Sequence, residues 1–568
     1  MASRSVARRT KVIQGHIASG NEKHQHVHAS TASTYAENNE RMVLGLALCD
    51  SSIPDPTSKV ITADQAAALV PDGTTITVGG FVGCGGAETL LNAIRRRHDA
   101  TSRPRNLSLV FGISVGDKLG RGTDALAKEG LVSSLTYAWI GTAPGLLKLV
   151  NNNKVTAWNL PFGAMSHLFR DIAANKPGPI TKIGLGTFVD PREKGGKVNS
   201  ATVENRVELV HMNGEEYCWY KAFPIHVALL RGTTADAQGN VSMEHEALYF
   251  DVLNQAMAAK NCGGLVIVQV ERIAQSLPAR LVHIPGVMVD HIVVSPPETH
   301  LQSFASAQYD PSLSGELRQP SSAIVPMKPG EKRIMAHRAM FELAEPNMLV
   351  NLGVGTPEGV SIMAMTHSHQ NRLASSAILS TEAGSLGGTP GGGLLFGAAF
   401  NPTATLPSST ILDFYQGGAI GLACLGMAEV DCFGNVNVSN FGAGRMPGCG
   451  GFVDISQSAQ KVIFMGTLTS GGLRTSVKNG KLVIEQEGKH RKFVNSVNEK
   501  TFAASSAGSR PVLYITERCV FRLTSQGLVL IEVAPGIEVE NVLENMDFKP
   551  LIPTEGPGAM DRRIFEMA

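Results

Sequence analysis

The sequence has no long hydrophobic run and no metal-binding pattern of cysteines. In its 568 residues no stretch approaches the roughly 20 apolar residues that a membrane-spanning helix needs. The best candidate, residues 419–427, is interrupted by Gly421 and Gly426, so we expect a soluble protein with no membrane partner. The eight cysteines form no CxxC pair and no zinc-like spacing, which predicts reduced thiols and no metal site.

An excess of charge is also missing, because 50 Lys and Arg residues face 49 Asp and Glu residues, for a formal net charge of +1. This balance gives no electrostatic reason to expect nucleic acid as a partner. Glycine is abundant instead, with 60 residues that follow no collagen-like period. So many glycines predict numerous tight turns and binding sites lined by backbone.

Residues 1–57 are interpreted as a leader. Arg4, Arg8, Arg9 and Lys11 all precede the first acidic residue, Glu22. On a helical wheel the apolar and basic side chains of this stretch fall on opposite faces, which is typical of a mitochondrial import presequence. We therefore expect the mitochondrial matrix as the location, with an unstructured tail on a cytoplasmic enzyme as the alternative.

Strand-like and helix-like segments alternate after the leader, which predicts an α/β fold. In the N-terminal domain, residues 58–295, the expected strands are 74–80, 106–112, 206–212, 226–232 and 263–270, and the expected helices are 89–97 and 248–260. Residues 296–331 are rich in Pro and Ser and are interpreted as a linker. The C-terminal domain, residues 332–568, begins with an expected helix at 333–344 and a strand at 348–354.

The two halves resemble each other. The segment RGTTADAQGNVSMEHEA (231–247) matches LGMAEVDCFGNVNVSNFG (425–442), and each places an acid shortly before a Gly-Asn-Val turn that follows an apolar strand. We infer an approximate duplication with an insertion in the first copy. Two similar open α/β domains that face each other would form a cleft at their interface, which is a preferred place for a ligand site.

Glu382 is the first candidate for chemistry. It follows a short apolar run, residues 377–379, and the ligand crevice of an open α/β sheet lies beyond the carboxyl ends of such strands. The glycines behind it would let a substrate approach main-chain N–H groups. Taken alone, these residues also fit an ordinary surface acid in a loop. A second acid, Glu246, is assigned to the start of the 248–260 helix, where it would favour the helix dipole.

Five long segments make the chain after residue 58 resemble the family I coenzyme A transferases, and among them the acetate/propionate type. The segments are TEAGSLGGTPGGGLLFGAAFNP (381–402), DFYQGGAIGLACLGMAEVDCFGNVNVSNFG (413–442), RMPGCGGFVDIS (445–456), GPITKIGLGTFVDPREKGGKVN (178–199) and QYDPSLSGE (308–316). One position departs from the family pattern: Ala87 stands where a proline is usual, and proline would prepare the first helical turn.

The resemblance implies that Glu382 is a catalytic nucleophile. As an ionised carboxylate it would attack the carbonyl of a short-chain acyl-CoA. A mixed anhydride and then a glutamyl-CoA thioester would follow, and a free short-chain acid would take up the CoA in a ping-pong reaction. Coenzyme A is thus expected as a co-substrate, with no permanently bound cofactor, in a homo-oligomeric enzyme.

By the same resemblance, backbone N–H groups of two glycine loops would stabilise the oxyanion of each tetrahedral step. The residues of these loops are Gly83, Cys84, Gly85 and Gly86 in the first half and Gly448, Cys449, Gly450 and Gly451 in the second. Weaker candidates for contact with CoA are Asn437, Phe441 and Gly442.

Three alternatives remain at this point. The first is a succinyl-CoA:3-oxoacid CoA-transferase, which would differ in the shape of the acid pocket. The second is an acyl-CoA thioesterase that uses the same glutamate, and the third is a sensor without catalysis on the same fold. An ATP-driven acyl-CoA synthetase is disfavoured, because the sequence has no phosphate loop with its lysine.

Overall fold

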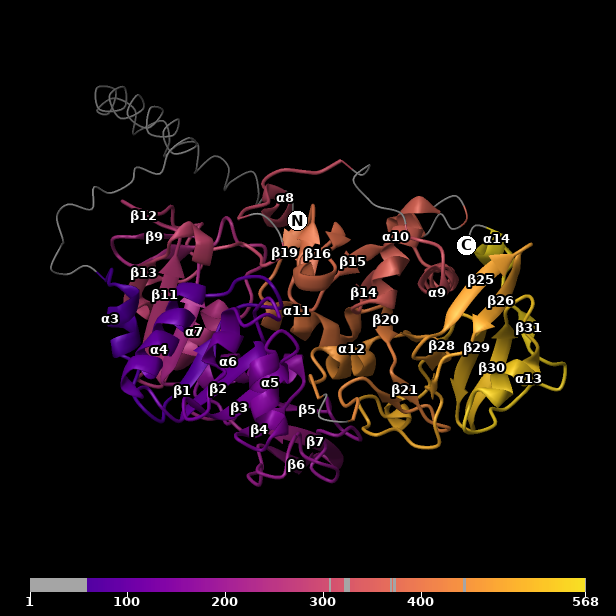
Figure 1. Ribbon diagram of the computed structural model, residues 1–568. Coiled ribbons are helices and arrows are strands. Elements are labelled where there is room, and N and C mark those ends of the chain that lie inside the picture. The colour runs from indigo at the N-terminus through magenta and orange to yellow at the C-terminus, as the bar shows by residue number, and fades with distance from the viewer. Residues whose placement is uncertain are drawn as a thin grey trace, which may run out of the picture.

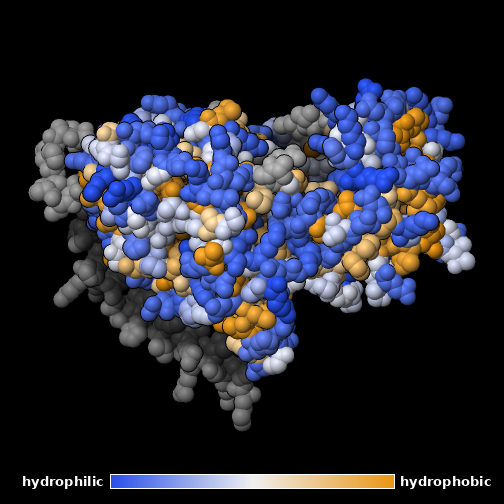
Figure 2. Space-filling view, turned by 60° about the horizontal axis from the view of Figure 1, so that its bottom comes forward, coloured by the Kyte–Doolittle hydropathy of each residue, from blue (hydrophilic) through white to orange (hydrophobic). Residues whose placement is uncertain are grey.

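The computed structural model describes residues 59–305, 308–320, 327–367, 370, 374–442 and 446–566. The leader and its expected presequence lie outside the described residues. Figure 1 shows two lobes, the N-terminal half and the C-terminal half, that meet in the middle of the molecule. Figure 2 shows a largely hydrophilic surface with scattered hydrophobic patches over both lobes. Among the described helices, none has the length and apolar character that crossing a membrane requires.

A seven-stranded sheet forms the first half, in the order β13-β11-β8-β1-β2-β3-β4, and all of its neighbouring strands are parallel. The strands are β1 (Thr75–Val78), β2 (Leu107–Ile113), β3 (Val132–Trp139), β4 (Thr156–Asn159), β8 (Val227–Arg231), β11 (Leu265–Val270) and β13 (His291–Val294). Parallel strands are covered on both faces, which explains why these segments are nearly continuous in apolar residues.

The C-terminal half contains a ten-stranded sheet whose five central strands are parallel, in the order β15-β14-β20-β23-β28. Their bounds are β14 (Leu349–Leu352), β15 (Ile378–Ser380), β20 (Leu422–Gly426), β23 (Val462–Met465) and β28 (Val512–Ile515). On one side β16 (Ser385–Leu386) and β19 (Ala404–Thr405) extend the sheet, and on the other β29 (Cys519–Thr524), β30 (Gly527–Val533) and β31 (Gly558–Ala559) do so.

The strand order confirms the two similar α/β halves. The series β13-β11-β8-β1-β2 in the first sheet has the same direction and order as β28-β23-β20-β14-β15 in the second. The repeated turns also match in their hydrogen bonds. Asp236 accepts the backbone N–H of Asn240 at 3.0 Å and its side-chain amide at 2.9 Å, and Asp431 accepts the same two groups of Asn435 at 3.0 and 2.9 Å.

The insertion expected in the first copy lies between β2 and β8. It contains β3, β4, α5 (Pro144–Asn151), α6 (Phe162–Ala173) and a small antiparallel sheet in which β7 (Glu215–Tyr220) lies between β5 (Ile180–Thr181) and β6. The segment expected as a strand at 206–212 forms β6 (Val207–Met212), but β6 pairs with β7 and lies outside the seven-stranded sheet. Helix α6 packs against α11 (Ser408–Phe414) and α12 (Phe452–Ser458) of the other half, so the insertion builds the interface (Figure 1).

Several expected helices begin or end elsewhere. Helix α4 spans Glu88–Thr101, α9 spans Glu331–Met340, and α10 (Gly359–Thr366) follows β14. Helix α7 spans Val252–Asn261, so Glu246 does not lie at its start as expected. Glu246 is buried, and its carboxylate accepts a hydrogen bond from Arg231 Nε at 2.9 Å. A buried guanidinium, rather than a helix dipole, therefore compensates its charge.

The segment expected as a linker is partly packed against the first half. Phe304 donates its backbone N–H to the carbonyl oxygen of Gly83 at 2.8 Å, and the Gln302 side-chain amide donates to the His245 carbonyl at 2.7 Å. Short helices η3 (Pro297–Thr299) and α8 (Pro311–Ser314) also lie in this segment. The division into domains at 295 and 332 stays a prediction.

Candidate active site

Glu382 lies in a turn directly after β15, which places its carboxylate beyond the carboxyl end of a parallel strand. Its side chain is 6% exposed and lines a cavity of about 340 Å³. Both halves contribute to the walls. The large apolar side chains among them are Phe81, Ile113 and Trp139 from the first half and Phe396, Phe441 and Phe452 from the second.

Buried hydrogen bonds fix the end of β15. The Tyr415 hydroxyl donates to Ser380 Oγ at 2.7 Å, and Asn351 Nδ2 donates to the Tyr415 hydroxyl oxygen at 3.3 Å. On the other side, Thr381 Oγ1 donates to the carbonyl oxygen of Gly397 at 2.6 Å. These contacts hold the backbone on both sides of Glu382 and so restrict where its carboxylate can point.

The Glu382 carboxylate is in an unusually apolar place. Burial raises its pKa from 4.5 to about 7, and the charge of the buried Asp454 carboxylate raises it further, against the lowering effects of its own backbone N–H and of Asn351. One oxygen, Oε2, has no hydrogen-bond partner among the described residues. A carboxylate that ionises near neutral pH and keeps a free oxygen is suited to nucleophilic attack. Burial thus brings the pKa of Glu382 close to neutral pH, so the carboxyl group is only partly ionised there.

The loop 448–451 lines the cavity, but its N–H groups are not equivalent. Cys449 donates its N–H to Asn159 Oδ1 at 3.1 Å, and Gly450 donates to the carbonyl oxygen of Ala138 at 2.9 Å. Both bonds tie the loop to the first half, so these two groups are not free to hold an oxyanion. For Gly448 and Gly451, the described residues provide no acceptor of the N–H, and Gly451 lies against Glu382.

The other expected loop, residues 83–86, lies behind the cavity wall. The residues of this region that line the cavity are Phe81 and Val82, and Cys84 exchanges two backbone hydrogen bonds with Phe81 at 2.9 Å. Gly85 packs against the ring of Phe250, where a side chain would clash, and the next residue, Gly86, packs against Val115.

Gly83, Cys84, Gly85 and Gly86 are thus not among the residues that line this cavity, and their role as oxyanion donors stays a prediction. Burial raises the pKa of the Cys84 thiol to about 11, so it is not a reactive thiolate. Val82, which does line the cavity, has a φ of 54°. This conformation is strained for a β-branched residue.

The three weaker candidates for contact with CoA differ in whether they line the cavity. Phe441 lines the cavity and is 42% exposed. Asn437 is fully buried, and its amide is committed: Nδ2 donates to Glu429 at 2.8 Å, and Oδ1 accepts the N–H of Ser439 at 3.1 Å. Gly442 is outside the cavity lining. Of the three, Phe441 is thus the one that lines the cavity, and contact of any of them with CoA stays a prediction.

Several residues of the cavity were not found from the sequence. Lys118 comes from the loop after β2, Trp139 is the last residue of β3, and Asn351 lies in β14. Among the described residues that line the cavity, Lys118 is the one cation. The signal that could have identified these residues is their place near the carboxyl ends of parallel strands. In the described part of the chain, no group of three or more His, Cys, Asp or Glu residues is arranged to hold a metal ion.

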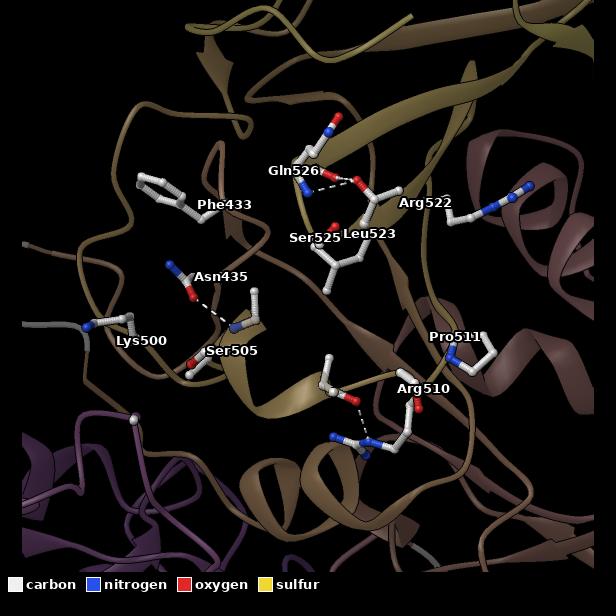
Figure 3. Close-up of a pocket in the computed structure, with 18 of the residues that line it drawn as sticks. Phe433, Asn435, Lys500, Ser505, Arg510, Pro511, Arg522, Leu523, Ser525 and Gln526 are labelled. Carbon is white, nitrogen blue, oxygen red and sulfur yellow. Dashed lines mark hydrogen bonds between the residues drawn. The ribbon is translucent and has the colours of Figure 1, made fainter. Parts of the chain in front are cut away.

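A larger hollow, of about 1290 Å³, lies away from Glu382. Figure 3 shows Phe433, Asn435 and Lys500 on one side of it and Leu523 and Gln526 on another. Three of the cations that line it are engaged: the Lys500 ammonium forms an ion pair with Glu193, Arg192 pairs with Asp190, and Arg510 donates to backbone carbonyl groups. We therefore place the chemistry in the smaller cavity, which contains the free carboxylate oxygen.

Comparisons with known proteins agree with this geometry. Residues 60–295 match the sequence model of the coenzyme A transferase family. The chain is 41% identical over 507 residues to the caffeate CoA-transferase of Acetobacterium woodii, covering 88% of this chain and 96% of that protein. It is 39% identical over 515 residues to the acetate CoA-transferase YdiF of Escherichia coli (strain K12), covering 89% and 95%.

A solved structure is similar over the same extent. The acyl-CoA transferase YdiF of E. coli O157:H7, in a thioester complex with CoA, matches with a TM-score of 0.82 at 38% identity. The match covers 89% of this chain and 96% of that chain. With this identity to whole relatives, the chain belongs to the coenzyme A transferase family and is an enzyme, a CoA-transferase.

Proposed function

We propose that the protein transfers CoA from a short-chain acyl-CoA, such as acetyl- or propionyl-CoA, to a free short-chain carboxylic acid, with Glu382 as the covalent carrier. The observation that carries this proposal is the free Oε2 of a buried carboxylate in a cavity shared by both halves. The names of the two relatives support CoA transfer and differ in the acid, acetate against caffeate. The thioester complex of the similar structure supports a covalent route.

The steps balance without any other reactant. Glu382 Oε2 attacks the thioester carbonyl carbon, the C–S bond breaks, and a mixed anhydride forms as the CoA thiolate leaves. The thiolate then attacks the Glu382 Cδ carbon, which releases the first acid as a carboxylate and leaves a glutamyl-CoA thioester. A second carboxylate repeats these steps in reverse and departs as the new acyl-CoA, with Glu382 restored.

Each attack creates a negative oxygen that needs a donor. Gly451 is the best placed candidate, because its backbone lies against the Glu382 side chain and the described residues provide no acceptor for its N–H. Loss of one such donor typically costs about 2.7 to 4 kcal/mol of transition-state stabilisation. The apolar walls of the cavity favour transfer over hydrolysis, since water is the competing nucleophile for both intermediates.

The proposal is tested by trapping the intermediate. The protein is incubated with acetyl-CoA and then with sodium borohydride, and the reduced peptide is identified by mass spectrometry. We expect reduction at Glu382, no transferase activity in Glu382→Ala, and full activity in the control Glu345→Ala, which changes an exposed glutamate. Transfer by the Glu382→Ala variant would refute the mechanism. Net hydrolysis that exceeds exchange with labelled acetate would show a thioesterase instead.

We also propose a homo-oligomer and an import presequence in residues 1–57, on the strength of the family resemblance and of the basic residues in the leader. Light scattering of the purified enzyme tests the first proposal. N-terminal sequencing of the protein from its source cells tests the second, because an intact Met1 would contradict cleavage of a presequence.

A further inference from the structure

A single π-helical turn follows α11 and lies behind the catalytic cavity. It spans Tyr415–Ala419 (η8). Its first residue, Tyr415, is fully buried and is not among the residues that line the cavity, so a substrate in the cavity does not touch it. Single π turns inside α-helices are frequent at functional sites. Here the turn directs the Tyr415 hydroxyl group to Ser380, the last residue of the strand that precedes Glu382.

Three hydrogen bonds at this point form a chain with one direction. The Ser380 hydroxyl donates to the carbonyl oxygen of Val350 at 3.1 Å. A carbonyl oxygen only accepts, so the single proton of Ser380 Oγ is used there, and Ser380 Oγ accepts from the Tyr415 hydroxyl at 2.7 Å. The Tyr415 oxygen is left to accept, and it does so from Asn351 Nδ2 at 3.3 Å. Burial raises the pKa of the Tyr415 hydroxyl above its ordinary value, so the chain keeps this direction at neutral pH.

The chain determines which way the Asn351 amide is turned. Its NH₂ group faces Tyr415 and also donates to the carbonyl oxygen of Ser380 at 3.4 Å. With the amide reversed, Asn351 Oδ1 would face two oxygens that have no proton to donate to it. In the observed orientation Oδ1 is buried and has no partner among the described residues. The hydroxyl group of Tyr415 therefore selects one of two possible orientations of this amide.

The orientation of the Asn351 amide matters to the nucleophile. Asn351 lines the cavity together with Glu382, and its amide lowers the pKa of Glu382, because an N–H group stabilises the ionised carboxylate. A reversed amide would present an oxygen instead and would disfavour the carboxylate that attacks. The other titratable groups around Glu382 are the buried Asp454 carboxylate of α12 and, in the cavity lining, Cys449 and Lys118.

We propose that Tyr415 is a positioning residue of the transfer reaction: its hydroxyl group fixes the amide of Asn351, which in turn favours the attacking carboxylate of Glu382. The proposal rests on the function proposed above, because that function makes Glu382 the nucleophile. Since Tyr415 touches no reacting atom, its hydroxyl should affect the reactivity of Glu382 and not the binding of acyl-CoA. Donors that are already oriented need no reorganisation at the moment of reaction.

Steady-state kinetics of Tyr415→Phe test this role. The substitution keeps the ring and removes the hydroxyl group, so we expect kcat to fall roughly 2- to 10-fold, the range for one neutral hydrogen bond, with KM for acetyl-CoA unchanged. The pH below which kcat/KM decreases should be higher than in the wild type. Unchanged kcat together with an unchanged pH profile would overturn the proposal.

Tyr220→Phe is the matched control. It removes another buried hydroxyl group, which donates to the carbonyl oxygen of Ile183 at 2.8 Å and lies outside the cavity lining. We expect its kcat and its pH profile to equal those of the wild type. An equal loss of kcat in Tyr415→Phe and Tyr220→Phe would contradict a specific role of Tyr415. Ser380→Ala interrupts the same chain one bond further on, and we expect it to change kcat and the pH profile in the same direction as Tyr415→Phe.

A double-mutant cycle separates positioning from packing. If Tyr415 acts through Asn351, adding Tyr415→Phe to Asn351→Ala should cause no further loss of kcat. An additive loss would contradict the proposal. It would indicate packing, or the hydrogen bond that Gln416, the next residue of the turn, donates to Asp454 Oδ1 at 3.1 Å.

Infrared titration provides a measurement without turnover. The carbonyl band of the protonated Glu382 carboxyl group is identified by its absence in Glu382→Gln. We expect this band to titrate at a higher pH in Tyr415→Phe than in the wild type, and the same midpoint in both proteins would contradict the proposal. A shifted midpoint in an enzyme that transfers no CoA would refute the proposed function and leave the role of Tyr415 in place.

Discussion

The Cα of Gly451 lies against the side chain of Glu382, since a Cβ at residue 451 would be 3.1 Å from Glu382 Cγ and 3.4 Å from its Cβ. A methyl group there must displace the nucleophile or the loop. We expect Gly451→Ala to lower kcat several-fold, because this contact requires a shift of a few tenths of an ångström and a misplacement of about 1 Å can cost about 100-fold. Gly417→Ala is the control, as a Cβ at residue 417 has nothing within 4 Å. Similar activity of the two variants would contradict this reading.

The rate of the first half-reaction should depend on pH. Glu382 attacks only as a carboxylate, and burial raises its pKa to about 7. We therefore expect kcat/KM to fall about tenfold per pH unit below about 7 and to level off above it. Rapid-quench measurement of glutamyl-CoA thioester formation from acetyl-CoA across pH 5 to 9 checks this. A profile that is flat down to pH 5 would show that the free enzyme holds Glu382 ionised.

Asp454 should control the position of that profile. Its buried carboxylate raises the pKa of Glu382 and accepts the N–H of Gly163, from the other half, at 2.9 Å. Asp454→Asn removes the charge and keeps an oxygen acceptor. The pKa of Glu382 should therefore fall, and the pH below which kcat/KM decreases should become lower. If Asp454 served packing alone, the variant would be less active, but the pH at which kcat/KM begins to fall would be unchanged.

Stability should change with pH in the opposite sense to activity. The folded state holds the Glu382 proton up to about pH 7, whereas the group has an ordinary pKa of 4.5 in the unfolded chain. The folded state binds more protons between these values, so its stability falls as the pH rises. Glu382→Gln should therefore be more stable than the wild type at pH 8, by up to about 3 kcal/mol. The difference should vanish near pH 4, as measured by urea unfolding.

The repeated turns should make similar contributions. Asp236 and Asp431 each accept the same backbone and side-chain groups of their asparagine, and both are almost fully buried. Removing either acid leaves buried donors unpaired, which costs about 1 to 3 kcal/mol per group. We expect Asp236→Ala and Asp431→Ala to lower the free energy of unfolding by comparable amounts. If only one variant lost stability, the turn in the other half would contribute little to the free energy of unfolding.

The sequence predicts the fold better than it predicts the site. Apolar runs located β1, β2, β8, β11 and β14, and the repeated Gly-Asn-Val turns revealed the duplication. The strands β3 and β4 and the helix α6 were missed, although they build the interface between the halves. Glu382 could be placed because its apolar strand and the glycines beside it are neighbours in the chain.

The remaining features of the site depend on contacts between distant residues. The glycine motif at 448–451 does not reveal that Asn159 occupies the N–H of Cys449. The raised pKa of Glu382 follows from burial by both halves. Such relationships arise from packing and leave no local pattern.

The duplication separates the tasks of the enzyme between its copies. The second copy has Glu382 after β15, whereas Ser114 follows β2, the matching strand of the first copy, and exchanges its hydroxyl hydrogen bond with Thr142 at 2.6 Å. The first copy is left to supply walls such as Ile113 and Trp139. On the proposed mechanism, substitutions in those walls should change which acid is accepted while the nucleophile stays in place, so selectivity could evolve in one copy and reactivity in the other.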